Sequence, residues 1–270
     1  MKIFSKFYDS KIFEANLYNA KHINFSLFVD NIPATQQDLS EINIIVLAEP
    51  NEYFGLHDWV LQNKDIFSVI LTWDDKILNT CENSIFLPFG STWFKTNQYE
   101  KVHDKKFEIA HLCGTLLKSY GHQMRHEILD REFEFKMPTN FYKTIGNRHI
   151  EDDARIGKET VFGNSQFGIA IENFSHRGYF SEKILDCFLM KTIPVYWGCS
   201  NIGDFFNVDG IVKFDNVDDL LYQINKMTPE YYESYKNIIE QNYSLALNYV
   251  DYPKNICDKV MDVFTLNKLV

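Results

Sequence analysis

Short apolar runs that alternate with polar or helical segments constrain the fold of this chain more than any other feature. Residues 42–48 are almost continuously apolar, as a strand buried on both faces of a sheet would be. Residues 66–72 repeat this pattern, and the segment between the two runs, 57–64, is predicted to be helical. Strands that alternate with helices along a chain predict an α/β fold with a parallel sheet.

The second half of the chain repeats the alternation. Its strands are predicted at 107–113, 167–171 and 192–197, and its helices include 122–133 and 181–191. The whole chain is therefore expected to be α/β, with no internal repeat.

A polar and charged stretch at 95–106 separates the two halves, and we interpret it as a linker. The predicted organisation is an N-terminal Rossmann-like domain over 1–105, a C-terminal domain over 106–250, and a final helix, 251–270, placed to pack back on the N-terminal domain. One large sheet is the alternative that periodicity alone leaves open.

The charge balance restricts the partners. The 270 residues include 27 Lys and Arg against 37 Asp and Glu, which gives a net charge of −10. Because binding to nucleic acid and docking on anionic lipid both depend on a basic surface, this balance argues against both. Any anionic ligand has to be held by a few well-placed cations.

The sequence also predicts a compartment. No apolar run reaches the roughly 20 residues that span a bilayer, and residues 1–6 lack the apolar segment of a signal peptide. The five cysteines are odd in number, widely spaced and include no C-x-x-C pair, so reduced thiols are expected. These features predict a soluble, cytoplasmic protein.

The segment 171–183 is the most informative for chemistry, because it follows an apolar strand and opens a helix. Ser181 is placed to cap that helix, whose free N–H groups and positive dipole end favour anions. Lys183 adds a positive charge that opposes the dipole, and an anionic ligand would resolve this conflict. The alternative is that Glu182 and Lys183 simply solvate the start of a helix.

Residues 171–198 resemble the donor-binding motif of the α1,3/4-fucosyltransferases, glycosyltransferase family 10. That family carries the pattern F-E-N-(x)-Y-x-T-E-K, followed by a helix and a strand of the type I-P-I/V-Y-W-G. The matching parts of this chain are Ile-Glu-Asn at 171–173, Tyr179, Ser-Glu-Lys at 181–183 and Ile-Pro-Val-Tyr-Trp-Gly at 193–198. Isoleucine and serine replace the family's usual phenylalanine and threonine.

The resemblance implies a GT-B type fold, in which two Rossmann-like domains face a cleft. It implies GDP-fucose as the donor, a hydroxyl of a glycan as the acceptor, and a donor site formed by Arg125, Asn173, Tyr179, Glu182 and Lys183. Arg125 would grip the diphosphate, since a planar guanidinium pairs well with phosphate oxygens. With Lys183 and the helix N-terminus it would neutralise the diphosphate without a metal, so no cofactor is expected.

Glu49 is the candidate general base, because it matches the family's catalytic carboxylate in a loop after a strand. Pro50 keeps it out of a helix and ends the strand. Ala48 and Pro50 depart from the family's G-E-N-like context, which makes Glu52 a rival. The next candidates for the base are Asp74 and His57.

The predicted function is an inverting glycosyltransferase similar to α1,3-fucosyltransferases. The alternatives are a transferase that uses another nucleotide-sugar, and an inactive protein that binds a nucleotide or a glycan. His122 and His126 lie four apart on a predicted helix, but no third ligand accompanies them, so no metal site is predicted. The acceptor, the linkage and the oligomeric state do not follow from the sequence.

Overall fold

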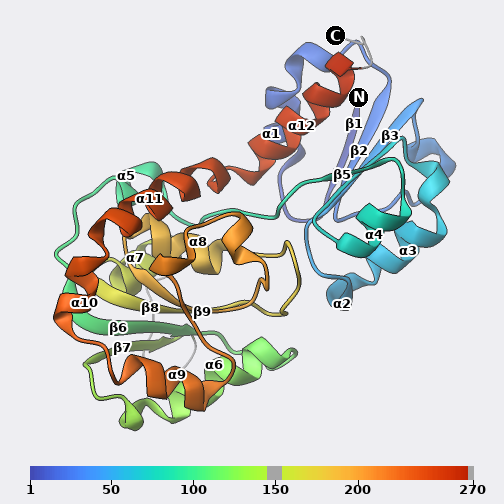
Figure 1. The fold of residues 1–270 in the computed structure, drawn as a ribbon. Coiled ribbons are helices and arrows are strands. Elements are labelled where there is room, and N and C mark those ends of the chain that lie inside the picture. Colours follow the sequence, from blue (N-terminus) through green and yellow to red (C-terminus); the bar gives the residue numbers. More distant parts are fainter. Residues whose placement is uncertain (145–153, 267–270) are drawn as a thin grey trace. The chain divides into compact units, whose positions relative to one another are not determined.

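Two five-stranded sheets, in which all paired strands are parallel, carry the fold in the computed structural model (Figure 1). The structure describes residues 1–144 and 154–266. The chain divides into two units. Unit 1 holds Met1–Phe89, Arg177–Tyr179 and the C-terminal helix, and unit 2 holds the described residues of Gly90–His176 and Phe180–Val250.

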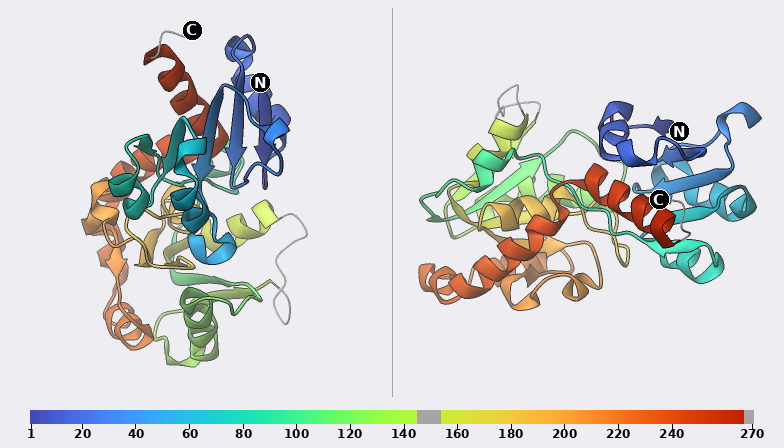
Figure 2. Two further views of the ribbon diagram at one scale, coloured as in Figure 1. Left: turned by 90° about the vertical axis from the view of Figure 1, so that its right-hand side faces the viewer. Right: turned by 90° about the horizontal axis from the view of Figure 1, so that it is seen from above.

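The sheet of unit 1 follows the order of the chain. Its strands are β1 (Lys2–Ser5), β2 (Phe25–Val29), β3 (Ile42–Leu47), β4 (Val69–Thr72) and β5 (Ser84–Phe86), which run side by side (Figure 2). β3 lies in the centre, where Ile44 faces Leu27 of β2 and Val69 of β4. Its residues after Ile42 are all buried, which confirms the strand predicted from the apolar run.

Helices cover both faces of this sheet. They are α1 (Ser10–Asn16), α3 (Leu56–Gln62), α4 (Asp75–Thr80) and α12 (Tyr252–Leu266). On one face α1 and α12 pack on Ile44 and Val46, and on the other α3 and α4 pack on Ile45 and Leu47. Because successive strand side chains point to opposite faces, a strand covered on both sides has to be apolar throughout.

The sheet of unit 2 has the strand order β10-β9-β8-β6-β7. Its strands are β6 (Lys106–Cys113), β7 (Thr139–Lys143), β8 (Ser165–Ile171), β9 (Ile193–Trp197) and β10 (Val212–Lys213). β8 lies in the centre and is buried along its whole length.

The helices of unit 2 also form two layers. They are α6 (Tyr120–Asp130), α7 (Ala154–Phe162), α8 (Glu182–Leu189), α9 (Val217–Ile224) and α11 (Lys236–Ala246). One cluster of buried side chains joins α7, α8 and α11 to one face of the sheet, through residues such as Val161, Leu185 and Ala246. A second cluster joins α6 and α9 to the other face. The predicted α/β fold with parallel sheets is therefore confirmed.

Some elements differ from the sequence prediction. β1, β7 and α1 were not predicted. Residues 229–246 form two helices, α10 (Pro229–Ser234) and α11, which are separated at Tyr235. The stretch 95–106 contains α5 (Thr96–Tyr99), and Tyr99 is buried in the core of unit 2. All five cysteines are free and buried. Within the described residues, no helix is both long and apolar enough to cross a membrane.

Candidate functional site

The carboxyl end of β8 is tied to the start of α8. Glu172, which follows β8, is fully buried, and its carboxylate accepts hydrogen bonds from the Ser181 N–H (2.9 Å) and the Ser181 hydroxyl. The Ser181 Oγ also accepts from the N–H of Lys183 (3.4 Å), which confirms the predicted helix cap. This junction lies outside the carboxyl end of a central strand, where α/β proteins bind ligands.

Lys183 lies between two carboxylates at this junction. Its Nζ is 3.2 Å from Glu182 Oε1 and 3.6 Å from Glu172 Oε2. Burial alone would lower the pKa of Lys183, but Glu182 and Glu172 outweigh it and raise that pKa. Burial raises the pKa of Glu172, which the charge of Lys183 offsets only in part. The two carboxylates therefore keep Lys183 charged at a helix N-terminus whose dipole opposes it.

Arg125 reaches the same junction from α6. Its guanidinium donates to the carbonyl of Ile171 and to Asn173 Oδ1 (2.8 Å), and the side chain is only 8% exposed. The approach depends on Gly121, because a Cβ there would lie 1.9 Å from the Glu172 carbonyl oxygen. The structure thus brings four predicted site residues together in unit 2, namely Arg125, Asn173, Glu182 and Lys183.

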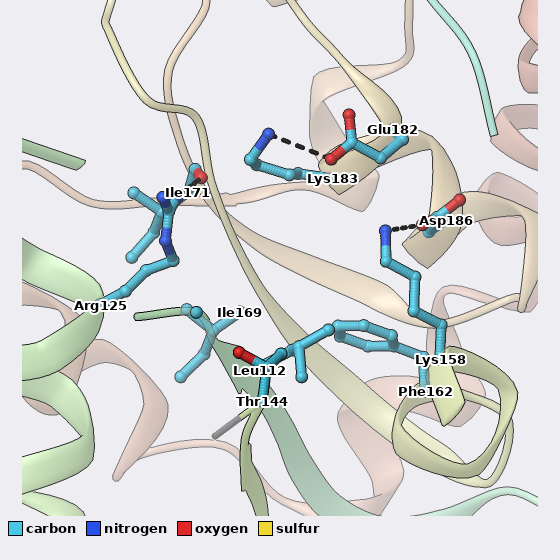
Figure 3. Close-up of a pocket in the computed structure, with 11 residues that line it drawn as sticks. Leu112, Arg125, Thr144, Lys158, Phe162, Ile169, Ile171, Glu182, Lys183 and Asp186 are labelled. Atoms are coloured by element: carbon cyan, nitrogen blue, oxygen red, sulfur yellow. Dashed lines mark hydrogen bonds and ion pairs between the residues drawn. The ribbon is translucent and has the colours of Figure 1, made fainter. Parts of the chain in front are cut away.

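A cavity of about 190 Å³ opens beside this junction (Figure 3). Three of its lining side chains are cationic: Arg125 from α6, Lys183 from α8 and Lys158 from α7. The full set is Leu112, Gly114, Arg125, Thr144, Lys158, Phe162, Ile169, Ile171, Glu182, Lys183 and Asp186. A concave site with several cations and an apolar floor suits a ligand that has both anionic and apolar parts.

Lys158 was not predicted as a site residue from the sequence. Its Nζ lies 2.5 Å from Asp186 Oδ2, and Asp186 Oδ1 accepts from the Thr92 hydroxyl (2.7 Å). Burial would raise the pKa of Glu182, but Lys183 and Lys158 together lower it to about 2. The sequence does place an acidic residue, Asp186, four residues after Glu182 on the otherwise apolar stripe of a helix. Its pairing with Lys158 is visible only in the fold.

The two rival carboxylates of unit 1 occupy different environments. Glu49 is half-buried at the carboxyl end of β3, directly before Pro50. Glu52 is exposed in the first turn of α2 (Asn51–Phe54).

Tyr179 also belongs to unit 1. It is 1% exposed, and its ring packs on Trp73 at 4.9 Å and on Phe89 at 6.0 Å between ring centroids. The structure gives this ring a place in the core of unit 1, whereas the other predicted donor residues cluster in unit 2.

Metal-ligating side chains do not gather in the described part of the chain: over residues 1–144 and 154–266, no group of three His, Cys, Asp or Glu side chains is arranged to hold an ion. The Nδ1 of His122 contacts the hydroxyl of Ser119, the residue that caps α6.

Two parallel α/β units of this kind make up the GT-B fold of nucleotide-sugar glycosyltransferases. A solved α1,3-fucosyltransferase superposes with a TM-score of 0.57 at 14% identity, over 94% of this chain and 92% of that chain. An α1,3-fucosyltransferase solved with GDP-fucose superposes with a TM-score of 0.55 at 15% identity, over 98% and 88%. These likenesses establish the fold.

Sequence comparison agrees with the motif. The chain is 31% identical, over 98 residues, to an alpha-(1,3)-fucosyltransferase of Helicobacter pylori. The match covers 35% of this chain and 20% of that relative, so the chain spans about a fifth of the length of the protein it matches. No protein-family model matches the chain. The resemblance to α1,3-fucosyltransferases is confirmed.

Proposed function

We propose that this protein is an inverting glycosyltransferase that transfers fucose from GDP-fucose to a hydroxyl group of a glycan. The observation that carries the proposal is the cavity at the start of α8, where Arg125, Lys158 and Lys183 gather. The similarity to α1,3-fucosyltransferases and the fold shared with one solved with GDP-fucose support the choice of donor.

The cations would bind the diphosphate of the donor. Arg125 offers a planar guanidinium that pairs with two phosphate oxygens, and Lys183 offers a point charge. The first turn of α8 adds the partial positive charge of a helix N-terminus. Asn173 and Glu182 would orient the nucleotide and the sugar.

The reaction would be a single displacement at C1 of fucose. Glu49 would take the proton of the acceptor hydroxyl as its oxygen forms a bond to C1, and the bond from C1 to the diphosphate oxygen would break. The electron pair would leave with GDP, whose developing charge Arg125 and Lys183 would stabilise. One in-line attack inverts the configuration at C1.

A panel of nucleotide-sugars tests the proposal. A ligand that binds only the folded state raises its stability by RT ln(1 + [L]/Kd), so GDP-fucose should raise the melting temperature more than UDP-sugars do. Release of GDP on addition of glycan acceptors then measures transfer. Stabilisation and transfer with a different nucleotide-sugar would assign another donor, and binding of GDP without transfer or hydrolysis would assign an inactive binding protein.

A further inference from the structure

The backbone at the carboxyl end of β3 is held by buried side chains. The N–H groups of Ala48 and Glu49 both donate to Asp30 Oδ1, at 2.8 and 3.2 Å. The carbonyl of Ala48 accepts from Trp73 Nε1 (2.7 Å), and the carbonyl of Glu49 accepts from His57 Nε2 (2.9 Å). All four backbone polar groups of these two residues are therefore bonded to side chains.

The three side chains come from three different elements and are almost completely buried. Asp30 follows β2, His57 lies on α3 and Trp73 follows β4; they are 2%, 2% and 3% exposed. The backbone N–H and C=O groups at the end of a strand ordinarily bond to water or to other backbone groups. Four hydrogen bonds from three buried side chains to two residues go beyond what ending a strand requires, because Pro50 already ends it.

His57 is itself held from its other side. Its Nδ1 lies 2.6 Å from Asp74 Oδ2, and Asp74 caps α4 by accepting from the N–H groups of Lys76 (2.7 Å) and Ile77 (3.1 Å). Partial burial would raise the pKa of Asp74, but the hydrogen bond and charge of His57, with these N–H groups, lower it. Since a backbone carbonyl can only accept, His57 donates from Nε2 to Glu49, while its Nδ1 is bonded to Asp74.

This arrangement excludes one alternative from the sequence analysis. Both ring nitrogens of His57 are occupied, one by Asp74 and the other by the Glu49 carbonyl, so neither is open to the proton of an acceptor hydroxyl. His57 is accordingly not a general base in this structure, although it touches the residue we propose for that role.

We infer that His57, held by Asp74, is a positioning residue that fixes the backbone of Glu49 and thereby aims its carboxylate. The inference rests on the proposed function, in which Glu49 is the general base. With its N–H and its carbonyl both bonded, the backbone of Glu49 is held in one position. This matters because a base acts only within hydrogen-bond reach of the proton, and a misplacement of about 1 Å can lower the rate on the order of 100-fold.

Two substitutions of His57 separate this role from simple packing. In His57→Gln the amide nitrogen reaches the place of Nε2 and keeps the bond to the Glu49 carbonyl. In His57→Asn the amide falls at the place of Nδ1, so the contact with Asp74 remains and the bond to Glu49 is lost. His103→Asn is the matched control, because His103 Nε2 also contacts a backbone carbonyl, that of Gln98 (3.0 Å), away from Glu49.

The readouts are the kcat for transfer, the Kd for GDP, and the order parameter of the Glu49 N–H bond from ¹⁵N relaxation. We expect His57→Asn to lower kcat about 10- to 100-fold with an unchanged Kd for GDP, and to make the Glu49 N–H more mobile. His57→Gln should recover most of both losses, and His103→Asn should change neither. Equal effects of the Asn and Gln variants, or no effect of either, would overturn the inference.

The relaxation measurement keeps this outcome distinct from failure of the proposed function. The wild-type protein could transfer no sugar while the Glu49 N–H responds to His57→Asn as expected. In that case the contact between His57 and Glu49 is real, but the glycosyltransferase proposal fails and the contact has no catalytic role. If the wild type transfers fucose and His57→Asn leaves kcat intact, the positioning role fails and the proposed function stands.

Discussion

The ammonium group of Lys183 lies 3.6 Å from a carboxylate oxygen of Glu172 that has no exposure to solvent. Glu172 in turn holds Ser181, the residue that caps α8. One short network therefore links a buried carboxylate, a helix cap and a cation at the edge of the cavity. In the proposed function, a bound diphosphate would share Lys183 with the two carboxylates that now surround it.

Lys183→Ala should weaken GDP binding by about 10- to 100-fold, because a hydrogen bond to a charged group contributes about 1.5–3 kcal/mol. Isothermal titration calorimetry with GDP measures the change. Lys213→Ala is the matched control, since it removes an exposed positive charge from β10 of the same unit. An unchanged GDP affinity in the Lys183 variant would remove this residue from the binding site.

Lys158→Ala should destabilise the protein by about 3 kcal/mol at neutral pH, because it removes the cation that stabilises the buried Asp186 carboxylate. Burial already raises the pKa of Asp186, and loss of Lys158 raises it further. The native state then holds a proton that the unfolded state releases. The loss of stability should therefore be largest at pH 8 and shrink below about pH 4, the ordinary pKa of an aspartate.

Urea denaturation at pH 4 and pH 8 measures whether the loss of stability grows with pH in this way. Lys254→Ala is the control, since Lys254 pairs with Asp258 on the surface, where such pairs contribute at most about 1 kcal/mol. If Lys158→Ala loses the same stability at both pH values, Asp186 does not carry an unpaired charge in that variant.

Sequence patterns predicted the central strands and the helix cap because these depend on local physics. β3 was predicted since both faces of a central strand have to be apolar, and Ser181 since a helix start needs an acceptor for its N–H groups. β7 escaped prediction because it is an edge strand in which only Phe141 is fully buried.

The site was predictable only in part, because a local sequence motif identifies some of its residues and not others. Arg125, Asn173, Glu182 and Lys183 were found through a motif and do lie together. The pair of Lys158 and Asp186, and the contact of His57 with the Glu49 carbonyl, join residues on separate elements whose approach depends on the packing of the whole unit. No pattern of neighbouring residues encodes such contacts.

Asp30 should make the stability depend on pH in the acid range. Burial raises its pKa from 3.8 to about 6, although the N–H groups of Ala48 and Glu49 and the charges of His57 and Lys6 lower it. A raised pKa in the native state means that stability is complete below the unfolded pKa and is lost as pH rises through the native one. The loss between pH 4 and pH 7.5 is about 3 kcal/mol at most.

Asp30→Asn removes this titration and keeps an acceptor for both N–H groups. Asparagine also tolerates the positive φ of 46° at this position. The stability of the variant relative to wild type should rise from pH 4 to pH 7.5 in urea denaturation. Asp30→Ala should be less stable at both pH values, because it leaves both N–H groups without their acceptor. Parallel pH profiles for wild type and Asp30→Asn would contradict the assignment.

Chelation of divalent ions should leave transfer intact. Arg125, Lys183 and the N-terminus of α8 supply the positive charge that a metal ion would otherwise supply to the diphosphate. Transfer rates with and without EDTA test this expectation. Complete loss of activity with EDTA, restored by Mn²⁺, would show that the cations of the cavity do not suffice.

Glu49→Gln provides the decisive test of the mechanism. The substitution keeps the size of the side chain and leaves the contacts of the Glu49 backbone with Asp30 and His57 in place. Because Arg125, Lys158 and Lys183, which would bind the diphosphate, lie in unit 2, the affinity for GDP should stay the same. Transfer should fall by on the order of 10²- to 10⁴-fold, the usual contribution of general base catalysis.

The rival carboxylate supplies the control for this test. Glu52 is exposed at the start of α2, outside the set of buried side chains that hold Glu49, so Glu52→Gln should leave the rate nearly unchanged. The acid limb of the pH–rate profile should disappear in Glu49→Gln, because that limb reports protonation of the base. If Glu52→Gln abolishes transfer and Glu49→Gln does not, the roles of the two residues are exchanged. If neither changes the rate, Asp74 is the next residue to test, because both ring nitrogens of His57 are already occupied.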